Sequence, residues 1–345
     1  MNSQPVQATN SAEEPVEALL ERAFEARRPL FGERQEGALR LFNGFLEGCP
    51  ELVVDLYATT AVLHDCSESP KQGEALVEVA QELLGACFPW IRAIVLKRRN
   101  GSSAADRRGR IIFGEAPDRK VREHGVWYAV DLCMSRDASL YLDTRNLRRW
   151  AIENLRGKTV LNAFAYTGSL GIAALAGGAR RVVQLERNRR FLNLAKTSYT
   201  LNGFPISQKD FLLGDFFPAV GALKRAGDRF GCVFLDPPFF STTQKGTVDL
   251  AASSSRLINK VRPLVEDGGR LVAVNNALFV SGRAYLETLE SLCADGYLEI
   301  EELIPVPEDF TGYPGTRRGA PITDPAPFNH ATKIAVLRVR RKGDH

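Results

Sequence analysis

The residues best suited to chemistry follow a predicted strand in the second half of the chain, where the sequence reads Asp236-Pro237-Pro238-Phe239-Phe240. Two consecutive prolines cannot donate to a sheet ladder and they fix φ, so strand pairing ends there in a rigid loop. An acid before the prolines and an aromatic ring after them provide a hydrogen-bond acceptor and a stacking face. We therefore expect this loop to hold a planar base with an amino or ring nitrogen, with Phe239 stacked on the base and Phe240 packed behind it.

A glycine turn provides the second candidate site. The sequence Tyr166-Thr167-Gly168-Ser169-Leu170-Gly171 lies between an apolar run and a helix-periodic segment. It has the second and third glycines of a dinucleotide-binding G-x-G-x-x-G turn, but Tyr166 replaces the first, which weakens a pyrophosphate site. A ligand with a ribose and no phosphate fits this turn better, although such turns are also purely structural in many α/β proteins.

Two acids follow the next two predicted strands. Glu186 ends the first of these strands, and an ionised carboxylate there can accept bonds from two vicinal ribose hydroxyls. Asp215 precedes Phe216 and Phe217, and the three residues offer an acceptor and apolar walls for an adenine ring. Each acid has a structural alternative, because Glu186 can favour the following helix N-terminus and Asp215 can act as an N-cap.

The elements that must position these residues alternate between strand and helix from about residue 140. Short spacing of this kind predicts an α/β fold with a doubly wound parallel sheet, and two final strands without a helix between them predict an antiparallel edge. The seven predicted strands are 159–162, 181–186, 206–213, 232–236, 270–275, 298–306 and 333–340.

The first part of the chain predicts a smaller α+β accessory domain over residues 15–135, before a catalytic domain over residues 136–345. Apolar residues at helical spacing predict helices over 13–26, 34–46 and 72–87, and β-branched runs predict a strand pair over 52–56 and 60–64. Residues 1–14 have neither a basic n-region nor an apolar h-region, so we expect a disordered tail and not a signal peptide.

The composition is that of an ordinary globular protein, with 44% apolar and 25% charged residues among 345. No apolar run approaches the ~18–20 residues needed to span a bilayer, which predicts no membrane partner. The six cysteines are scattered and the histidines do not cluster, so we expect no metal site and reduced thiols in a cytoplasmic protein.

Basic residues are concentrated in one segment. From Lys97 to Arg122 there are nine Lys and Arg residues against three Asp and Glu residues, although the formal net charge is only +4. Such a segment suits a phosphate backbone, and Arg317 and Arg318 in the long Pro- and Gly-rich connection over residues 308–329 could also reach a phosphate. Solvated loops are the alternative at both places.

Taken in this order, the motifs resemble those of the class I S-adenosylmethionine-dependent methyltransferases. Within that class they are similar to the bacterial 23S rRNA large-subunit base methyltransferases, with residues 162–168 similar to the first motif, residues 141–148 to a cofactor-flanking segment, and DPPFF to the fourth motif. The resemblance implies a Rossmann-like methyltransferase sheet, S-adenosyl-L-methionine as cofactor and RNA, namely 23S rRNA, as partner. It implies catalytic roles for Asp236, Pro237, Pro238 and Phe239. It implies cofactor contacts for Asp143, Arg145, Asn162, Phe164, Tyr166, Thr167, Gly168, Glu186, Arg187, Asp215 and Phe216.

The absence of a cysteine at the strand ends limits which atom of a base could accept the methyl group. The family includes cytosine-C5 enzymes and guanine-N2/N7 enzymes, and C5 methylation needs a cysteine nucleophile near the fourth or fifth strand end. The fifth predicted strand ends with Asn275-Asn276 and no cysteine, and Cys232 begins the fourth strand far from the site, which favours a base nitrogen. The acidic helical start is unlike the family's N-terminal PUA domain. This difference leaves open the same chemistry on a nitrogen of a protein or a small molecule. An alternative of another class is an NAD-dependent oxidoreductase, which would need an intact G-x-G-x-x-G turn.

Overall fold

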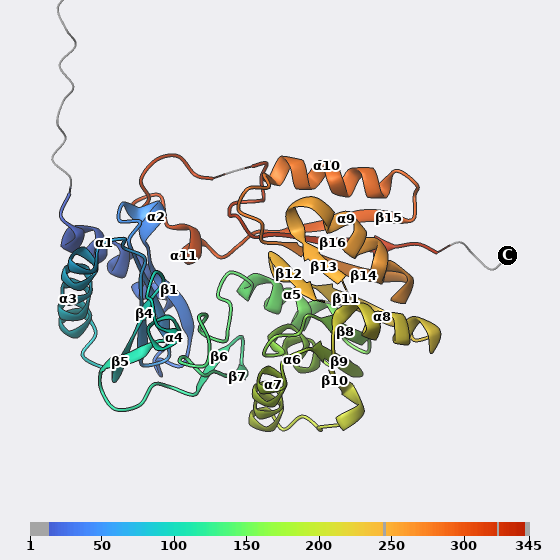
Figure 1. The fold of residues 1–345 in the computed structure, drawn as a ribbon, viewed down its shortest axis with the longest axis horizontal. Coiled ribbons are helices and arrows are strands. Elements are labelled where there is room, and N and C mark those ends of the chain that lie inside the picture. Colours follow the sequence, from blue (N-terminus) through green and yellow to red (C-terminus); the bar gives the residue numbers. More distant parts are fainter. Residues whose placement is uncertain (1–13, 244–245, 323, 342–345) are drawn as a thin grey trace, which may run out of the picture.

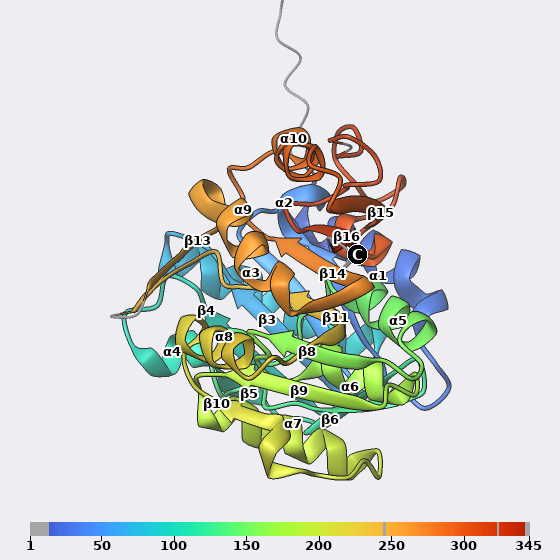
Figure 2. The same cartoon turned by 90° about the vertical axis from the view of Figure 1, so that its right-hand side faces the viewer.

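A seven-stranded sheet in the C-terminal part carries the candidate chemistry. The computed structural model describes residues 14–243, 246–322 and 324–341, so nearly all of the predicted N-terminal tail lies outside the described residues. The strand order is β10-β9-β8-β11-β14-β16-β15, parallel except where β16 pairs antiparallel with β14 and β15. The strands are β8 (Thr159–Ala163), β9 (Arg181–Glu186), β10 (Phe211–Leu213), β11 (Phe230–Leu235), β14 (Val265–Asn275), β15 (Leu298–Ile304) and β16 (Lys333–Val339). The predicted doubly wound sheet with an antiparallel edge is thereby confirmed (Figure 2).

Helices cover both faces of this sheet, so the strands at its centre are buried on both sides. One face packs against α5 (Arg145–Asn154), α6 (Ser169–Ala176) and α7 (Arg189–Leu201). The other packs against α8 (Phe216–Arg225), α9 (Leu250–Val261) and α10 (Gly282–Cys293). Short 3-10 turns precede β10 and β14 (Gln208–Asp210 and Arg262–Leu264). No helix in the described residues is both long and apolar enough to cross a membrane.

A second, five-stranded sheet lies beside the first in the N-terminal part (Figure 1). Its strands, in spatial order, are β1 (Ala38–Asn43), β2 (Leu52–Tyr57), β3 (Thr60–Asp65), β4 (Ala93–Arg98) and β5 (Arg110–Phe113). The helices of this part are α1 (Val16–Arg27), a 3-10 turn (Arg28–Leu30), α2 (Gly44–Glu47), α3 (Pro70–Cys87) and α4 (Ala104–Arg108). Apolar residues of α1 and α3 form one core with the sheet.

Three further elements connect the two sheets. The ribbon of β6 (Lys120–Glu123) and β7 (Val126–Ala129) contributes to a core that also contains residues of β2, β3, α6 and α7. The helix α11 (Glu308–Thr311), inside the connection predicted to be structureless, lies against β1. The stretch up to residue 135 therefore packs against both sheets.

Two predictions for individual elements were wrong. Residues 34–46 form β1 and the single-turn helix α2 instead of one long helix, because five of the six residues of β1 are buried between neighbouring elements. The strand predicted over 206–213 is limited to β10, because a 3-10 turn occupies residues 208–210. The hairpin of β12 (Phe240–Thr243) and β13 (Gly246–Asp249), which precedes α9, was not predicted.

Candidate active site

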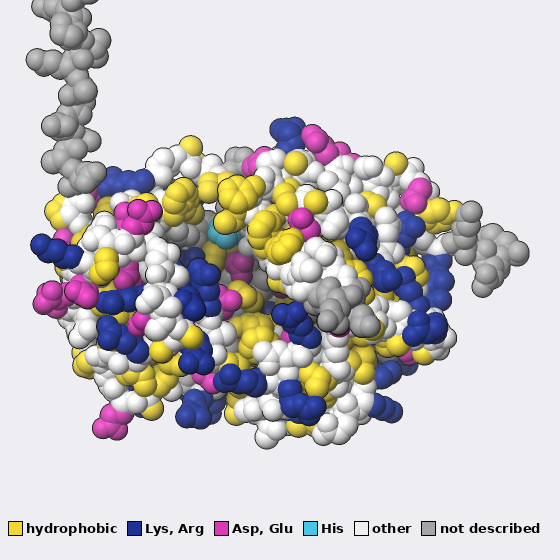
Figure 3. All heavy atoms as spheres, viewed as in Figure 1, with side chains coloured by type: hydrophobic (Ala, Val, Ile, Leu, Met, Phe, Trp, Pro, Cys, Tyr) yellow, Lys and Arg dark blue, Asp and Glu magenta, His cyan; other side chains and the backbone are white. Residues whose placement is uncertain are grey.

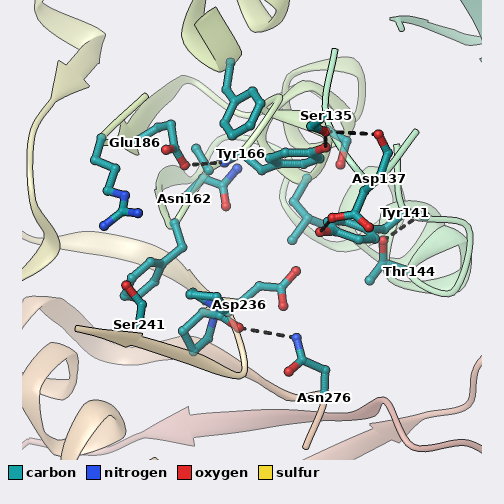
Figure 4. Close-up of a pocket in the computed structure, with 18 of the residues that line it drawn as sticks. Ser135, Asp137, Tyr141, Thr144, Asn162, Tyr166, Glu186, Asp236, Ser241 and Asn276 are labelled. Carbon is teal, nitrogen blue, oxygen red and sulfur yellow. Dashed lines mark hydrogen bonds between the residues drawn. The ribbon is translucent and has the colours of Figure 1, made fainter. Parts of the chain in front are cut away.

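A cavity of about 760 Å³ opens at the carboxyl ends of β8, β9, β11 and β14, where open α/β sheets bind their ligands. Its walls come from the loops that follow these strands, from the segment before α5 and from the start of β16 (Figure 4). The residues lining it are Ser135, Arg136, Asp137, Tyr141, Asp143, Thr144, Asn162, Phe164, Ala165, Tyr166, Ser169, Leu170, Glu186, Arg187, Phe191, Asp236, Pro237, Pro238, Phe240, Ser241, Thr242, Asn276 and Thr332.

The glycine turn forms the inner wall by an unusual backbone path. Phe164 and Tyr166 have φ values of 62° and 51°, in the left-handed region that non-glycine residues rarely adopt. Gly168 has φ 80° and precedes α6, and a Cβ there would lie only 2.8 Å from the Cβ of Ala195. This tight path brings the first turn of α6, including Ser169, to the cavity.

Glu186 fixes the turn from the end of β9. One carboxylate oxygen accepts the N–H of Tyr166 at 3.0 Å and the other accepts the N–H of Asn188 at 2.9 Å. Burial raises the pKa of this carboxyl, while the backbone N–H groups oppose that rise. An ionised carboxylate has about four acceptor positions, so capacity remains for hydroxyl groups of a ligand in the cavity.

Aromatic rings give the cavity apolar walls on the same side. Tyr166 lies between Tyr141 and Phe191, with ring centroids 5.1 Å and 4.5 Å away. Phe164 stacks on Phe216 at 4.4 Å with an interplanar angle of 24°. These distances are typical of stabilising aromatic pairs, so the rings hold one another in place without a ligand.

Asp236 lies across the cavity from the glycine turn, after the last residue of β11. Burial, and second the negative charge of Asp143, raise its pKa to about 7. Asp143 accepts the hydroxyl of Thr332 at 2.7 Å, which fixes its position. The two acids therefore form a partly desolvated pair in which Asp236 changes its protonation state near neutral pH.

The carbonyl of Pro237 has a partner within the protein. Asn276, just after β14, donates its side-chain amide to that carbonyl at 3.4 Å (Figure 4). This bond uses one of the two lone pairs of the carbonyl and fixes the proline loop to the end of β14, beside the carboxyl of Asp236.

Two buried acceptors of the cavity wall have no partner within the described residues. They are the side-chain oxygens of Asn162, on β8, and of Asn276. Asn162 uses its amide nitrogen to donate to Gln184 at 2.9 Å, which leaves its oxygen toward donors from elsewhere. Buried polar atoms are rarely left unpaired, so these oxygens fit a ligand that carries N–H or O–H groups.

Nine of the residues predicted for the site line the cavity: Asp143, Asn162, Phe164, Tyr166, Glu186, Arg187, Asp236, Pro237 and Pro238. Thr167, Gly168, Asp215 and Phe216 do not line it, although Phe216 stacks on the lining residue Phe164. Thr167 donates to the carbonyl of Ser139, and Asp215 caps α8 by accepting the N–H of Phe217 at 3.1 Å. For Asp215 the structure thus shows the N-cap alternative.

Two predicted residues occupy different places. Arg145 begins α5 and does not line the cavity, because its guanidinium pairs with Asp309 and donates to the carbonyl of Ala38 at 3.0 Å. Phe240 lines the cavity and Phe239 does not, which is the reverse of the stacking order expected from the sequence. The carbonyl of Phe239 accepts the N–H of Leu250, which holds the start of the hairpin against α9.

The residues that sequence reasoning missed come mainly from outside the strand ends. Residues 135–137 reach the cavity from the irregular segment between β7 and α5, Phe191 from α7 and Thr332 from the position before β16. A sequence signal existed for the lining residues that lie in a motif already singled out. These are Tyr141 and Thr144 beside Asp143, Ala165, Ser169 and Leu170 in or beside the glycine turn, and Asn276 after the fifth predicted strand.

The first residue of the basic segment, Lys97, is neither in a loop nor exposed to a phosphate. Lys97 belongs to β4 and is fully buried, with its ammonium donating to the carbonyls of Arg108 and Ser135. Burial lowers its pKa to about 8. Other cations of the segment are exposed, namely Arg108, Arg110, Arg119, Lys120 and Arg122.

The two arginines of the long connection do not line the cavity. Arg317 donates to the carbonyl of Gly312 at 3.2 Å, and Arg318 pairs with Glu14 while its backbone N–H bonds to Leu46. Arg318 therefore holds this connection against the N-terminal part, and Arg317 forms a bond within the connection itself.

Comparison with known proteins shows the family of this chain. The family model for S-adenosylmethionine-dependent methyltransferases matches residues 76–312. Ribosomal RNA large subunit methyltransferase I of Vibrio cholerae is 33% identical over 239 residues, which are 68% of this chain and 59% of that protein. The same-named protein of Aeromonas salmonicida is 29% identical over 283 residues, 81% of this chain and 70% of that protein. The chain thus spans about 60–70% of these relatives' lengths. The crystal structure of SMU.776 complexed with SAH has a TM-score of 0.81 at 19% identity, over 94% of this chain and 80% of that one.

Proposed function

The chain belongs to the S-adenosylmethionine-dependent methyltransferase family, and we propose that it methylates a base nitrogen in RNA, with 23S rRNA as the substrate. The observation that carries the proposal is the position of Asp236 and the two prolines, across one cavity from the glycine turn and Glu186. A methyl donor held by the turn and a base held by the proline loop would meet inside this cavity.

The cofactor half of the cavity has the features that S-adenosylmethionine needs. Glu186 offers acceptor positions for ribose hydroxyls, and the Phe164 and Tyr166 side offers apolar walls. The unpaired oxygen of Asn162 suits a donor group of the ligand. When bound, the cofactor supplies an electrophilic methyl group on its sulfonium. Arg145 has no place in this half, and we propose that it positions the wall through Asp309 instead.

The acceptor half is built to orient an N–H group. With the Pro237 carbonyl already bonded to Asn276, the carboxylate of Asp236 accepts a hydrogen bond from the base nitrogen and aims its lone pair at the methyl group. Phe240 provides the stacking face beside it. Positioning and exclusion of water supply most of the rate in such a transfer, and the ionised form of Asp236 is the active one.

Three observations support RNA as the substrate. The relatives in Vibrio and Aeromonas carry names of ribosomal RNA methyltransferases. Arg136 and Arg187 are exposed and line the cavity, where they can meet phosphates. The five exposed cations between residues 108 and 122 extend the positive charge onto the N-terminal part, and we propose that residues 15–135 form an accessory domain that binds RNA.

A cytoplasmic location belongs to the same proposal. All six cysteines lie in the described part of the chain, and each is a free thiol. Free thiols are typical of proteins in a reducing compartment, where ribosomal RNA is also found.

The test has two stages. Calorimetric titration with S-adenosylmethionine and, separately, with NAD should show binding of the former alone. Transfer of a labelled methyl group from S-adenosylmethionine is then measured to unmodified 23S rRNA, to total cell protein and to small amines. Label in RNA that Asp236→Ala abolishes, with cofactor binding kept, would support the proposal. Label in protein or in amines alone would show that the substrate is not RNA. Binding of NAD alone would show that the protein is not a methyltransferase and would favour the oxidoreductase alternative.

A further inference from the structure

Two large apolar side chains stand almost fully in solvent beside the cavity. Leu278 is 74% exposed and Phe279 is 89% exposed, the largest value among the exposed apolar residues of the described chain. They occupy the tip of a turn over residues 277–280, which begins directly after the cavity residue Asn276. An isolated exposed apolar residue needs no explanation, but an adjacent pair at the edge of a reaction cavity does.

A buried lysine holds this turn in shape. The ammonium of Lys333 donates to the carbonyl of Ala277 at 2.9 Å, of Val280 at 2.7 Å and of Ala331 at 2.6 Å. Only 1% of Lys333 is exposed, so all three donors of a buried cation are used on backbone groups, two of them at the two ends of the turn. The backbone N–H of Val280 also bonds to the carbonyl of Ala277, at 3.3 Å.

The three hydrogen bonds of Lys333 explain why Leu278 and Phe279 remain exposed to solvent. A flexible turn would fold Leu278 and Phe279 onto the surface and remove their apolar area from water. With both carbonyls of the turn fixed to Lys333, the buried first residue of β16, the tip is presented as a rigid projection. A rigid projection loses little conformational freedom when it binds a partner.

The surroundings of the tip suit nucleic acid. Phe240 and Tyr141 are partly exposed aromatic residues of the cavity wall, and Arg136 and Arg187 are exposed cations of the same wall. In Figure 3, hydrophobic side chains gather along one edge of the hollow in this face, and Lys and Arg side chains lie around it. Aromatic faces next to cations are the combination that binds unpaired bases and their phosphates.

We propose that the Leu278–Phe279 tip is a wedge that stacks on an unpaired RNA base next to the target nucleotide and keeps the target out of its stack. This inference rests on the proposed function and adds which part of the protein selects single-stranded RNA. A base taken out of its stack leaves neighbours that need a new stacking surface, and the tip provides one beside the cavity into which the target goes.

The test compares Phe279→Ala and Leu278→Ala with Phe279→Trp and with the control Phe45→Ala. Phe45 is 75% exposed, lies on α2 and does not line the cavity. Phe45→Ala therefore removes a similarly exposed ring that is not part of the cavity. Affinity is measured by fluorescence anisotropy for a labelled unstructured 20-nucleotide RNA and for a duplex of equal length. Kinetics of methyl transfer to 23S rRNA and calorimetric S-adenosylmethionine binding complete the set.

Loss of one stacked base predicts a roughly 5- to 100-fold rise in KM for RNA with Phe279→Ala, with kcat changed much less. Affinity for the unstructured RNA should fall by a similar factor, while duplex binding and S-adenosylmethionine binding stay unchanged. Phe279→Trp should restore the affinity, and Phe45→Ala should behave as wild type.

The outcomes separate the wedge from the proposed function. Wild-type transfer to RNA with equal KM values for Phe279→Ala and Phe45→Ala would overturn the wedge alone. Wild-type S-adenosylmethionine binding without transfer to RNA would overturn the proposed function, and the wedge with it. Transfer to protein that needs Phe279 would mean that the tip docks a polypeptide.

Discussion

The pair of Asp236 and Asp143 makes the pH dependence of methyl transfer a direct test of the active-site geometry. Because the pKa of Asp236 is raised to about 7, only about a tenth of this carboxyl is ionised at pH 6 and about nine tenths at pH 8. If the ionised form orients the acceptor, the rate should rise almost tenfold per pH unit below about pH 6, about fivefold from pH 6 to 7, and approach its plateau above about pH 8.

The size of the effect follows from the two causes of the raised pKa. A rise from the ordinary value of 3.8 to about 7 corresponds to about 4 kcal/mol against the ionised form, at about 1.4 kcal/mol per pH unit. Burial is the larger cause and the charge of Asp143 the smaller. Replacing Asp143 by Asn removes the charge and keeps an oxygen for the Thr332 hydroxyl, so the midpoint should move below that of the wild type and remain above 3.8.

The assay is single-turnover methyl transfer to RNA from pH 5.5 to 8.5, with each profile normalised to its own plateau. Asp143→Asn should reach half of its plateau at a lower pH than the wild type. Asp236→Asn should give a low rate with no inflection near pH 7. A flat wild-type profile, or equal midpoints for the wild type and Asp143→Asn, would refute the assignment of the proton to this pair.

Three further predictions concern the cofactor wall, the basic segment and the packing of α6. Glu186→Gln should weaken S-adenosylmethionine binding by about tenfold in calorimetry, since one backbone N–H and the ribose lose charged acceptors; equal affinity would place the ribose elsewhere. Lys97→Met should lower the urea midpoint by leaving two carbonyls unpaired, at about 1–3 kcal/mol each, with RNA affinity and its salt slope unchanged. Gly171→Ala should destabilise by about 1–3 kcal/mol because its Cβ would lie 2.3 Å from the side-chain nitrogen of Gln184. Gly85→Ala, in an exposed and open position of α3, should stabilise by about 0.5–1 kcal/mol, and the same sign for both changes would contradict the packing argument.

The sheet could be predicted from the sequence because its strands are buried on both faces. Runs such as Val160-Leu161 and Val233-Phe234-Leu235 are continuously apolar, and helix-periodic segments separate them, so strand and helix are distinguished by length as well as by pattern. Residues 34–46 lacked that contrast. Ala38, Phe42 and Leu46 lie at helical spacing, but Leu39 and Leu41 are buried as well, and a short apolar run of this kind fits either element.

The site could be predicted as far as it consists of strand ends. Asn162, Glu186 and Asp236 end or follow parallel strands, and the carboxyl ends of such strands meet at one edge of the sheet. The opposite wall could not be predicted this way. Ser135 and Thr332 are far apart in the sequence and lie outside the parallel strands, so no local pattern indicates that they face the same cavity.

Arg145 shows how the N-terminal part bears on this opposite wall. The resemblance implied a cofactor contact for this arginine, and the structure pairs its guanidinium with Asp309, which is 2% exposed. The same carboxylate accepts the backbone N–H of Arg40 in β1 at 3.0 Å, and Arg145 itself donates to the carbonyl of Ala38 at the start of that strand. A buried charge pair with further hydrogen bonds is costly to separate, so β1, α11 and the start of α5 are held as one unit. Since α5 begins two residues after Asp143, this unit helps to set where Asp143 lies relative to Asp236, and therefore how much its charge contributes to the raised pKa of Asp236.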